Sequence, residues 1–320
     1  MPSEGWPASA PAANSRLGRE GRGLIVVSIN EATSKADNAH TPYVAEEIAA
    51  SGLAAIRAGA SILHFHARSR DGAQIMFGAS SDYQRAVELI AADEEALSFP
   101  VTYPSPLDPT SEEDAPHLWD LAISAPPRAR PQMAPYDCWR KGELPWWDEA
   151  RGKLSGQPYT SGAGEAREWR PPPFLSKIYR LGMIPYFICF EVGDVRWVCH
   201  LARAGVIRQP VLIQFAFFGR IVWGPAPNAA GIEAMLSALR PDVDAEVIVG
   251  AQLCESREQY EATLEYAADR GLSLRVGLGD CGEWRRSETN AELVEWASGL
   301  LARSGRTPAT AVEVKRHFGA

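Results

Sequence analysis

The stretch "TPYVAEEIAASGLAAIRAGASILHFHA" (residues 41–67) contains a helix pattern followed by a strand pattern, and this pairing decides the fold. The first part predicts a helix over residues 43–58, and Gly59 follows as a residue type that commonly ends helices. The run "SILHFHA" (61–67) predicts a strand. A helix that leads through a short turn into a strand is the repeating unit of α/β proteins, so the rest of the chain is expected to repeat it.

The same alternation continues from Leu24 onward. Strands are expected at residues 24–29, 61–67, 97–103, 128–134, 185–191, 210–217, 245–252 and 272–278. Helices are expected near residues 43–58, 81–95, 111–124, 174–182, 194–205, 227–239, 255–270 and 288–304. Eight such units in about 280 residues predict a (β/α)8 barrel, the TIM barrel. An open doubly wound sheet is the alternative, but that fold usually has a glycine-rich turn after its first strand, and "SINEATSK" (28–35) has no glycine.

The chain divides into an arm, a barrel and one long insertion. Residues 1–22 are rich in proline, alanine, serine and glycine, which predicts a disordered arm. Residues 23–320 are expected to form a single barrel domain. Residues 137–165 form an insertion after the fourth strand, in which tryptophans lie among charged residues and glycines. We interpret it as a lid or a subunit contact, because loops of this length are usually functional or disordered.

The composition narrows the classes of partner. The net charge is −8 at pH 7, so the chain does not offer the basic surface that nucleic acids and anionic membranes attract. The five cysteines form no CxxC pair, which indicates reduced thiols in a cytoplasmic protein. No run of 18 apolar residues is present, so no membrane span is expected. These features favour chemistry on small molecules or a protein partner.

Strand parity places two histidines inside the barrel. Successive side chains of a strand face opposite sides, so Leu63 and Phe65 should meet the surrounding helices while His64 and His66 face the interior. Two imidazoles at positions i and i+2 of one strand face can reach the same metal ion. The alternative is that they hydrogen-bond within the core or to a substrate. Active sites of such barrels lie at the carboxyl ends of the strands, where this pair is expected.

The eighth strand adds an inward-facing arginine. The same parity turns Arg275 toward the interior, where a guanidinium is costly to bury unless it is paired. Asp280, just past the strand, is the expected partner. The alternative is an ion pair that only closes the barrel.

Two motifs resemble those of a known family. "HFHARSRDG" (64–72) and "LRVGLGDCGEWRRSETNAELVEWASGLLARSGRTPATAVEVKR" (274–316) are similar to stretches of the β-keto acid cleavage enzymes, and the likeness runs from about Leu24 to Phe318. The resemblance implies a (β/α)8 barrel with a divalent metal, usually zinc, and suggests a homo-oligomer. It also implies that a β-keto acid reacts with acetyl-CoA to give acetoacetyl-CoA and a shortened acyl-CoA.

The resemblance assigns roles to particular residues. His64 and His66 match two of the metal ligands, while Arg275 and Asp280 match the family's arginine and catalytic aspartate. Glu31 lies one residue away from the place of a family glutamate after the first strand, and we expect it to act in catalysis. Substrate binding is expected from residues that follow the first three strands: Asn30, Arg68, Thr102 and Ser105.

One ligand position departs from the family's pattern. The family has a glutamate as its third metal ligand where this chain has Gly279. A catalytic zinc site normally has three protein ligands, so Asp280, Cys281, Glu31 or substrate oxygens are the candidates to complete it. If an acid is missing here, Gly279→Glu should raise the affinity for the metal.

Two other functions are kept as alternatives. A barrel that binds a ligand or partner without catalysis would explain Gly279, although Arg275 and Asp280 argue against it. A metal-dependent hydrolase is the second, because amidohydrolase barrels also use an HxH pair. Their pair lies on strand one with further histidines on strands five and six. Here the pair lies on strand two, and the fifth and sixth predicted strands contain no histidine.

Overall fold

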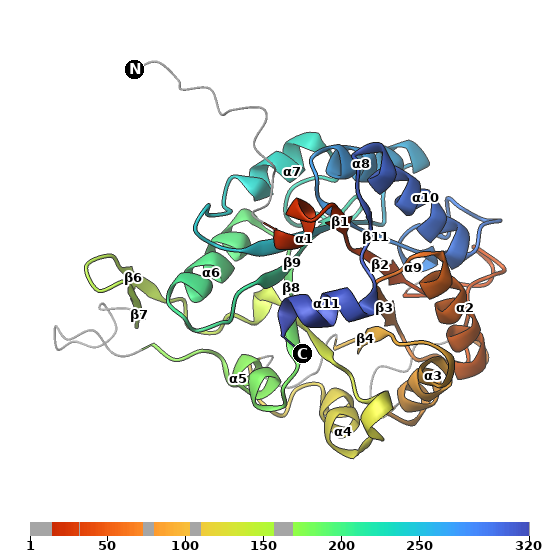
Figure 1. The fold of residues 1–320 in the computed structure, drawn as a ribbon, viewed down its shortest axis with the longest axis horizontal. Helices are drawn as coiled ribbons and strands as arrows, with labels where there is room; N and C mark the ends of the chain where they lie inside the picture. Colours follow the sequence, from red (N-terminus) through yellow and green to blue (C-terminus); the bar gives the residue numbers. More distant parts are fainter. Residues whose placement is uncertain (1–14, 32, 73–79, 103–109, 157–168, 320) are drawn as a thin grey trace.

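The computed structural model describes residues 15–31, 33–72, 80–102, 110–156 and 169–319. Within these residues, eight parallel strands are joined in the order β4-β3-β2-β11-β10-β9-β8-β5 and form a nearly closed barrel (Figure 1). The strands are β2 (Ile25–Ser28), β3 (Ile62–Phe65), β4 (Leu97–Pro100), β5 (Met133–Asp137), β8 (Ile184–Cys189), β9 (Val211–Phe218), β10 (Ala245–Gln252) and β11 (Ser273–Val276). The predicted barrel is therefore confirmed.

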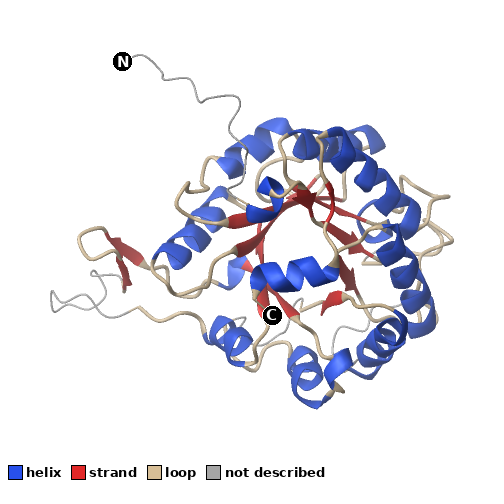
Figure 2. Cartoon of the chain, viewed as in Figure 1, coloured by secondary structure: helices blue, strands red, loops and turns tan. Residues whose placement is uncertain are grey.

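Helices alternate with these strands and surround the barrel (Figure 2). They are α2 (Ala45–Ala58), α3 (Ser80–Asp93), α4 (Pro116–Ser124), α5 (Pro173–Arg180), α6 (Val192–Arg203), α7 (Ala229–Leu236), α8 (Arg257–Asp269), the short α9 (Leu278–Cys281) and α10 (Asn290–Arg303). Several begin at side-chain caps. Ser256 accepts a hydrogen bond from the backbone N–H of Gln259 in α8, and Thr289 forms a capping box with Glu292 in α10. None of the described helices combines the length and apolar character that a bilayer crossing requires.

Side chains of the strands alternate between two apolar cores, as strand parity predicts. Leu63 and Phe65 are fully buried in the core between strands and helices. The core inside the barrel includes alternate strand residues, among them Val26, Ile62, Leu97, Phe99, Met133, Tyr186, Leu212 and Ile248. These apolar side chains fill the middle of the barrel, so His64 and Arg275 lie on the side of the strands' carboxyl ends.

The position of the fourth strand differs from the expectation. The sequence predicts it at residues 128–134, but β5 covers Met133–Asp137 and a short 3₁₀ helix covers Pro127–Ala129. Pro127 stands at the start of the 3₁₀ helix, a position that suits proline, and the residues that pair with β8 are Met133–Asp137, with Pro135 among them. The shift places Asp137 at the carboxyl end of a barrel strand.

The amino end of the barrel is covered by segments from both ends of the described chain. α1 (Arg16–Arg19) and α11 (Ala311–Phe318) lie there, and α11 crosses the centre of the barrel in Figure 1. β1 (Arg22–Gly23) pairs with β12 (Thr307–Pro308). Leu17 of α1 is buried in the same core as the barrel interior. The arm expected to be disordered at residues 1–22 is therefore ordered from Ser15, and residues 1–14 lie outside the described residues.

The insertion predicted at residues 137–165 contains a small hairpin. Its strands β6 (Trp146–Asp148) and β7 (Lys153–Ser155) project from the barrel in Figure 1. The ring of Trp147 lies against α6, with its centre 4.5 Å from the Arg203 guanidinium carbon and 5.0 Å from the His200 ring centre. Residues 157–165 lie outside the described residues, and the role as a lid or subunit contact stays a prediction.

Candidate metal and active site

A cavity of about 440 Å³ opens at the carboxyl ends of the barrel strands. Its polar lining residues are Glu31, His64, His66, Thr102, Asp137, Gln214, Gln252 and Arg275. Its apolar lining residues are Val101, Pro135, Trp139, Ile188, Phe190, Ala216, Phe218, Ile221, Trp223 and Leu253, and Gly279 completes the wall. This volume is in the range that small-molecule sites occupy, and the position is that of active sites in this barrel architecture.

Three potential metal ligands meet in this cavity. The ligand atoms of Glu31, His64 and His66 all lie within 4.8 Å of one another. His64 Nε2 is 3.1 Å from Glu31 Oε1, while His64 Nδ1 is 3.2 Å from the backbone oxygen of Phe99. If Nδ1 carries the proton and donates to that oxygen, Nε2 keeps a lone pair directed toward the other two ligands. Two imidazoles and one carboxylate are a ligand set that suits zinc.

Glu31 is held in place by its backbone and by Arg275. Its φ is +26°, on the left-handed side that residues other than glycine seldom adopt. Arg275 Nη2 donates a hydrogen bond to Glu31 Oε1. Burial alone would raise the pKa of Glu31, but the charge of Arg275 holds that pKa well below its usual value. The carboxylate is therefore charged, as a metal ligand must be.

Glu31 occupies a space that is open because Gly279 has no side chain. A Cβ atom at position 279 would lie 2.9 Å from both Cβ and Cγ of Glu31 and would overlap Ser28 Oγ. An acidic side chain at position 279 and the observed Glu31 therefore cannot both fit without rearrangement. The expectation that Gly279→Glu raises metal affinity is revised, because Glu31 already supplies an acid beside the two histidines.

Arg275 connects the strand ends around the site. Its Nε and Nη2 donate to the two oxygens of Asp280, each at 3.1 Å, and its Nη2 also donates to Ser28 Oγ at 3.1 Å. Gln252 donates to Asp280 Oδ1 at 2.9 Å. Asp280 is buried behind Arg275 and is not among the residues that line the cavity. Burial, against the opposing charge of Arg275, raises the pKa of Asp280. The predicted pair of Arg275 and Asp280 is thus present, with only the arginine facing the cavity.

Two of the predicted substrate-binding residues hold the protein's own backbone. Asn30 donates from Nδ2 to the carbonyls of Pro42 and His66, at 3.0 and 2.9 Å, and accepts from the N–H of His66 at 2.9 Å. Arg68 donates to the carbonyls of Thr33 and Asn30 at 2.5 and 2.8 Å. Neither residue is part of the cavity lining, so the contacts assign both to fixing the loops behind the metal ligands.

Thr102 and Ser105 are the other two residues predicted to bind the substrate. Thr102 lines the cavity and lies next to Asp137. Ser105 lies outside the described residues. Cys281, a candidate for the third ligand, donates to the backbone oxygen of Gly277 at 3.2 Å instead of joining the histidines.

Asp137 is a cavity residue that the sequence prediction missed. Burial, followed by the charge of Glu31, raises the pKa of Asp137 to about 7, against the opposing charge of Arg275. Its Oδ2 is 3.7 Å from Arg140 Nε. The sequence feature that could have revealed Asp137 was the fourth strand, which was predicted too early in the chain. A strand ending at "MAPYD" would have put this carboxyl beside the histidines.

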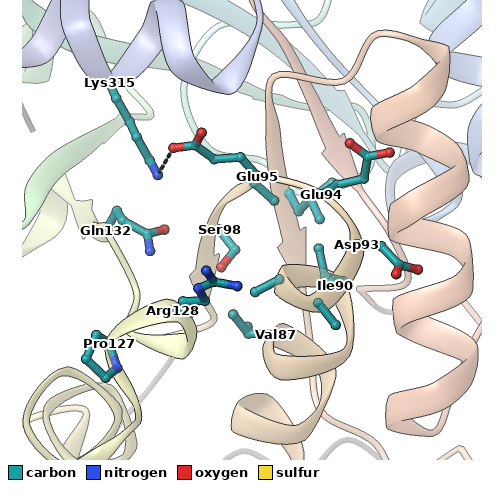
Figure 3. A pocket seen from close by; sticks show the side chains of 14 residues that line it. Val87, Ile90, Asp93, Glu94, Glu95, Ser98, Pro127, Arg128, Gln132 and Lys315 are labelled. Atoms are coloured by element: carbon teal, nitrogen blue, oxygen red, sulfur yellow. Dashed lines mark hydrogen bonds and ion pairs between the residues drawn. The ribbon is translucent and has the colours of Figure 1, made fainter.

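A second cavity of about 520 Å³ lies at the opposite end of the barrel, next to α3, β4 and α11 (Figure 3). Lys315 reaches across it to Glu95 at 2.6 Å, and Arg128 lies at its centre in Figure 3. Its described lining contains no histidine or cysteine. We place the candidate site in the first cavity, because among the described residues metal-ligating side chains converge there, at the carboxyl ends of the strands.

Comparison with known proteins agrees with this geometry. The model of the beta-keto acid cleavage enzyme family matches residues 23–319. The 3-keto-5-aminohexanoate cleavage enzyme of Fusobacterium nucleatum subsp. nucleatum is 24% identical over 287 residues, which cover 88% of this chain and 92% of that enzyme.

Solved structures share the barrel. The apo structure of ObcA has a TM-score of 0.57 and 17% identity, and the match covers 88% of this chain but 65% of ObcA. The ternary complex of ObcA with a C4-CoA adduct and oxalate has a TM-score of 0.58 and 16% identity, and covers 88% and 68%. At 16–17% sequence identity, these two matches show a shared fold and nothing finer. Because the family model covers nearly the whole chain, this protein belongs to the beta-keto acid cleavage enzyme family.

Proposed function

We propose that this protein cleaves β-keto acids with the help of a bound divalent metal, with zinc as the best match, and with acetyl-CoA as its second substrate. The observation that carries the proposal is the convergence of Glu31, His64 and His66 within 4.8 Å in the cavity at the strands' carboxyl ends. The family supports β-keto acid cleavage in general. The complex of ObcA with a C4-CoA adduct supports the use of a CoA ester.

The products follow from counting CoA groups. Acetoacetyl-CoA and a shortened acyl-CoA, the pair expected from the sequence, contain two CoA groups, whereas the substrates contain one. The balanced reaction joins the acetyl group to carbons 1 and 2 of the acid and moves CoA to the remaining acyl group. An acid R–CO–CH₂–COO⁻ and acetyl-CoA then give R–CO–CoA and acetoacetate. One carbon–carbon bond forms, one breaks, and no oxidant is required.

The ligand set fits a catalytic metal. His64 Nε2, one ring nitrogen of His66 and a Glu31 carboxylate oxygen would hold the ion, which is the three-ligand set typical of catalytic zinc. A bound divalent ion would polarise the keto carbonyl and favour loss of a proton from carbon 2. The hydrogen bond between His64 and the Phe99 carbonyl keeps the imidazole oriented, which is how protein groups around metal ligands commonly act.

The remaining cavity residues have complementary roles. Arg275 presents its guanidinium to the cavity and is suited to hold the substrate carboxylate, and Asp280 positions Arg275 from behind. Asp137 faces the same space with a pKa of about 7, so it can accept the proton from carbon 2 and later return it. We assign proton transfer to Asp137 instead of Asp280, because Asp280 does not line the cavity.

The test uses folded, untagged protein. We expect about one zinc, manganese, cobalt or nickel ion per chain, and formation of both acetoacetate and a new acyl-CoA from acetyl-CoA and a β-keto acid, detected by mass spectrometry. A chelator should abolish turnover, and metal addition should restore it. Folded protein without bound metal, or turnover that survives metal removal, would refute the metal-dependent reaction. Release of free CoA without an acyl-CoA product would point to a hydrolase.

A further inference from the structure

The cavity is charged on one side and apolar on the other. Its ionisable lining residues come from the ends of β2, β3, β5 and β11. The opposite side is formed by the ends of β8, β9 and β10 and by the loop between β9 and α7, and no described lining residue there carries a charge. We refer to this side as the apolar wall, which consists of Ile188, Phe190, Ala216, Phe218, Trp223 and Leu253.

Stacked aromatic rings form the outer part of the apolar wall. The ring centres of Phe190 and Trp223 are 4.5 Å apart with 14° between the ring planes, and those of Phe190 and Phe218 are 6.0 Å apart with 10°. Trp223 Nε1 donates to Glu191 Oε1 at 3.0 Å, so its only polar group is satisfied outside the cavity. The ring is thus fixed in orientation before any ligand arrives.

Two glycines fix the loop that carries Trp223. At Gly219, a Cβ atom would lie 2.6 Å from the Leu253 carbonyl oxygen, and at Gly224 it would overlap the carbonyl oxygen of Phe190. The φ of Gly224 is +70°, which also favours glycine. The loop therefore approaches the ends of β8 and β10 more closely than any other residue type would permit.

We propose that the apolar wall receives the substituent on carbon 3 of the β-keto acid, and that the preferred acids carry an uncharged, apolar substituent. This inference rests on the proposed function. With the carboxylate of the acid at Arg275 and its keto oxygen beside the two histidines, both polar ends of the substrate are placed on the charged side. The substituent then extends across the cavity, because Glu31, Asp137 and the histidines occupy the near side.

The chemistry of the wall selects against charge. An ammonium or carboxylate group placed against Ile188, Phe190 and Phe218 would lose water without gaining a partner, which is strongly unfavourable. An alkyl or phenyl group would gain contact with the rings instead. The family relative from Fusobacterium nucleatum is named for an acid with an amino group on carbon 5. We therefore expect this protein to differ from that relative in the acid it prefers.

The first experiment compares three acids of equal chain length with acetyl-CoA: 3-oxohexanoate, 3-oxoadipate and 3-keto-5-aminohexanoate. They end in a methyl group, a carboxylate and an amine-bearing segment respectively. We expect kcat/KM for 3-oxohexanoate to exceed that of either charged acid by at least about tenfold. Equal values, or a preference for a charged acid, would overturn the proposal.

The second experiment tests the wall directly. Trp223→Ala should raise KM for 3-oxohexanoate about five- to tenfold while changing KM for acetyl-CoA less than about twofold, and Trp223→Phe should largely restore the wild-type value. Ile123→Ala, at an exposed position on α4, serves as the control and should change neither. Thermal melts would verify folding. A rise in KM for acetyl-CoA alone would assign the wall to the pantetheine arm and overturn the proposal.

A binding measurement separates this inference from the proposed function. If no acid is turned over, the proposed function fails, but the three acids can still be compared by their quenching of tryptophan fluorescence. Stronger binding of 3-oxohexanoate that is lost in Trp223→Ala and kept in Ile123→Ala would support the apolar wall as its site. Equal binding of all three acids would overturn it.

Discussion

Glu31 and Gly279 come from opposite ends of the chain and share one volume inside the barrel. The side chain of Glu31 reaches the two histidines from the end of β2, and the absence of a side chain at position 279 leaves it room. We therefore expect Glu31→Ala to weaken zinc binding by at least about 100-fold, because one of three ligands is lost. Gly279→Glu alone should also weaken it, because the new side chain collides with Glu31.

The double variant Glu31→Ala with Gly279→Glu provides the decisive comparison. Removal of Glu31 Cγ and the atoms beyond it frees part of the volume into which residue 279 points, while the contacts with Cβ of residue 31 and with Ser28 Oγ remain. Part of the lost affinity should therefore return. Zinc affinity is measured by competition with a chromophoric chelator, and circular dichroism verifies folding. Stronger zinc binding by Gly279→Glu alone would show that Glu31 is not the ligand.

A second prediction at the level of single residues concerns Asp137. Asp137→Asn keeps the shape of the side chain but cannot accept a proton. We expect kcat to fall by about 10²- to 10⁴-fold with a small change in KM, because general acid–base catalysis typically contributes that much. Asp269→Asn, at an exposed position near the end of α8, is the control and should keep full activity. If Asp280→Asn lowers kcat while Asp137→Asn does not, the assignment of the base is reversed.

At the scale of elements, the loop between β9 and α7 links stability to substrate binding. Gly224→Ala introduces a Cβ at φ +70° that overlaps the Phe190 carbonyl oxygen, whereas Gly182→Ala introduces one at φ +74° with open space around it. In the control, only the strain of the left-handed backbone is added, so its unfolding free energy should fall by about 1–2 kcal/mol. Gly224→Ala should lose more and should also raise KM for the β-keto acid. Equal losses and an unchanged KM would show that the loop adjusts freely.

The elements also show how far sequence reasoning reaches. Parity predicted correctly that His64 and Arg275 face inward, because a two-residue period is a local property of the chain. The role of Glu31 depends on a φ of +26° in a single turn, which residue types do not reveal. Asp137 was missed because the fourth strand was expected at residues 128–134, whereas the observed strand ends at Asp137. Asn30 and Arg68 have the right chemistry to bind a substrate, but only the fold shows that backbone carbonyls accept hydrogen bonds from Nδ2 of Asn30 and from Nη1 and Nη2 of Arg68.

At the scale of the whole molecule, the amino end of the barrel contains a buried acid. Glu246 accepts hydrogen bonds from Ser15 and, at 2.6 Å, from Ser273. Burial nevertheless raises the pKa of Glu246 above its usual 4.5. A raised folded-state pKa means that the native state holds this proton more tightly than the unfolded state. The stability contributed by Glu246 is therefore present below pH 4.5 and is lost as the pH rises through the folded-state pKa.

Because the pKa of Glu246 is raised in the folded state, we predict that replacing this residue changes stability in a pH-dependent way. The side chain of the Glu246→Gln variant cannot ionise. The variant should therefore become more stable relative to wild type as the pH rises from 4 to 8, which urea denaturation would measure as a growing difference in unfolding free energy. Glu313→Gln provides a control of opposite sign. Hydrogen bonds from Thr310 lower the pKa of Glu313, so this variant should be less stable than wild type at pH 7, with a smaller difference near pH 4. A difference for Glu246→Gln that does not vary with pH would contradict the assignment.

The cover formed by α1 and α11 has a consequence for the order of events. Apolar side chains fill the middle of the barrel and both helices lie across its amino end, so the described structure offers one entrance to the site. Under the proposed reaction, two substrates and two products must pass through it. The small acid has to lie deepest, against the histidines, whereas the long CoA chain must trail outward through the mouth. Under that reaction we expect ordered binding, in which the acid enters first, acetyl-CoA closes the path behind it, and acetoacetate leaves only after the acyl-CoA has departed.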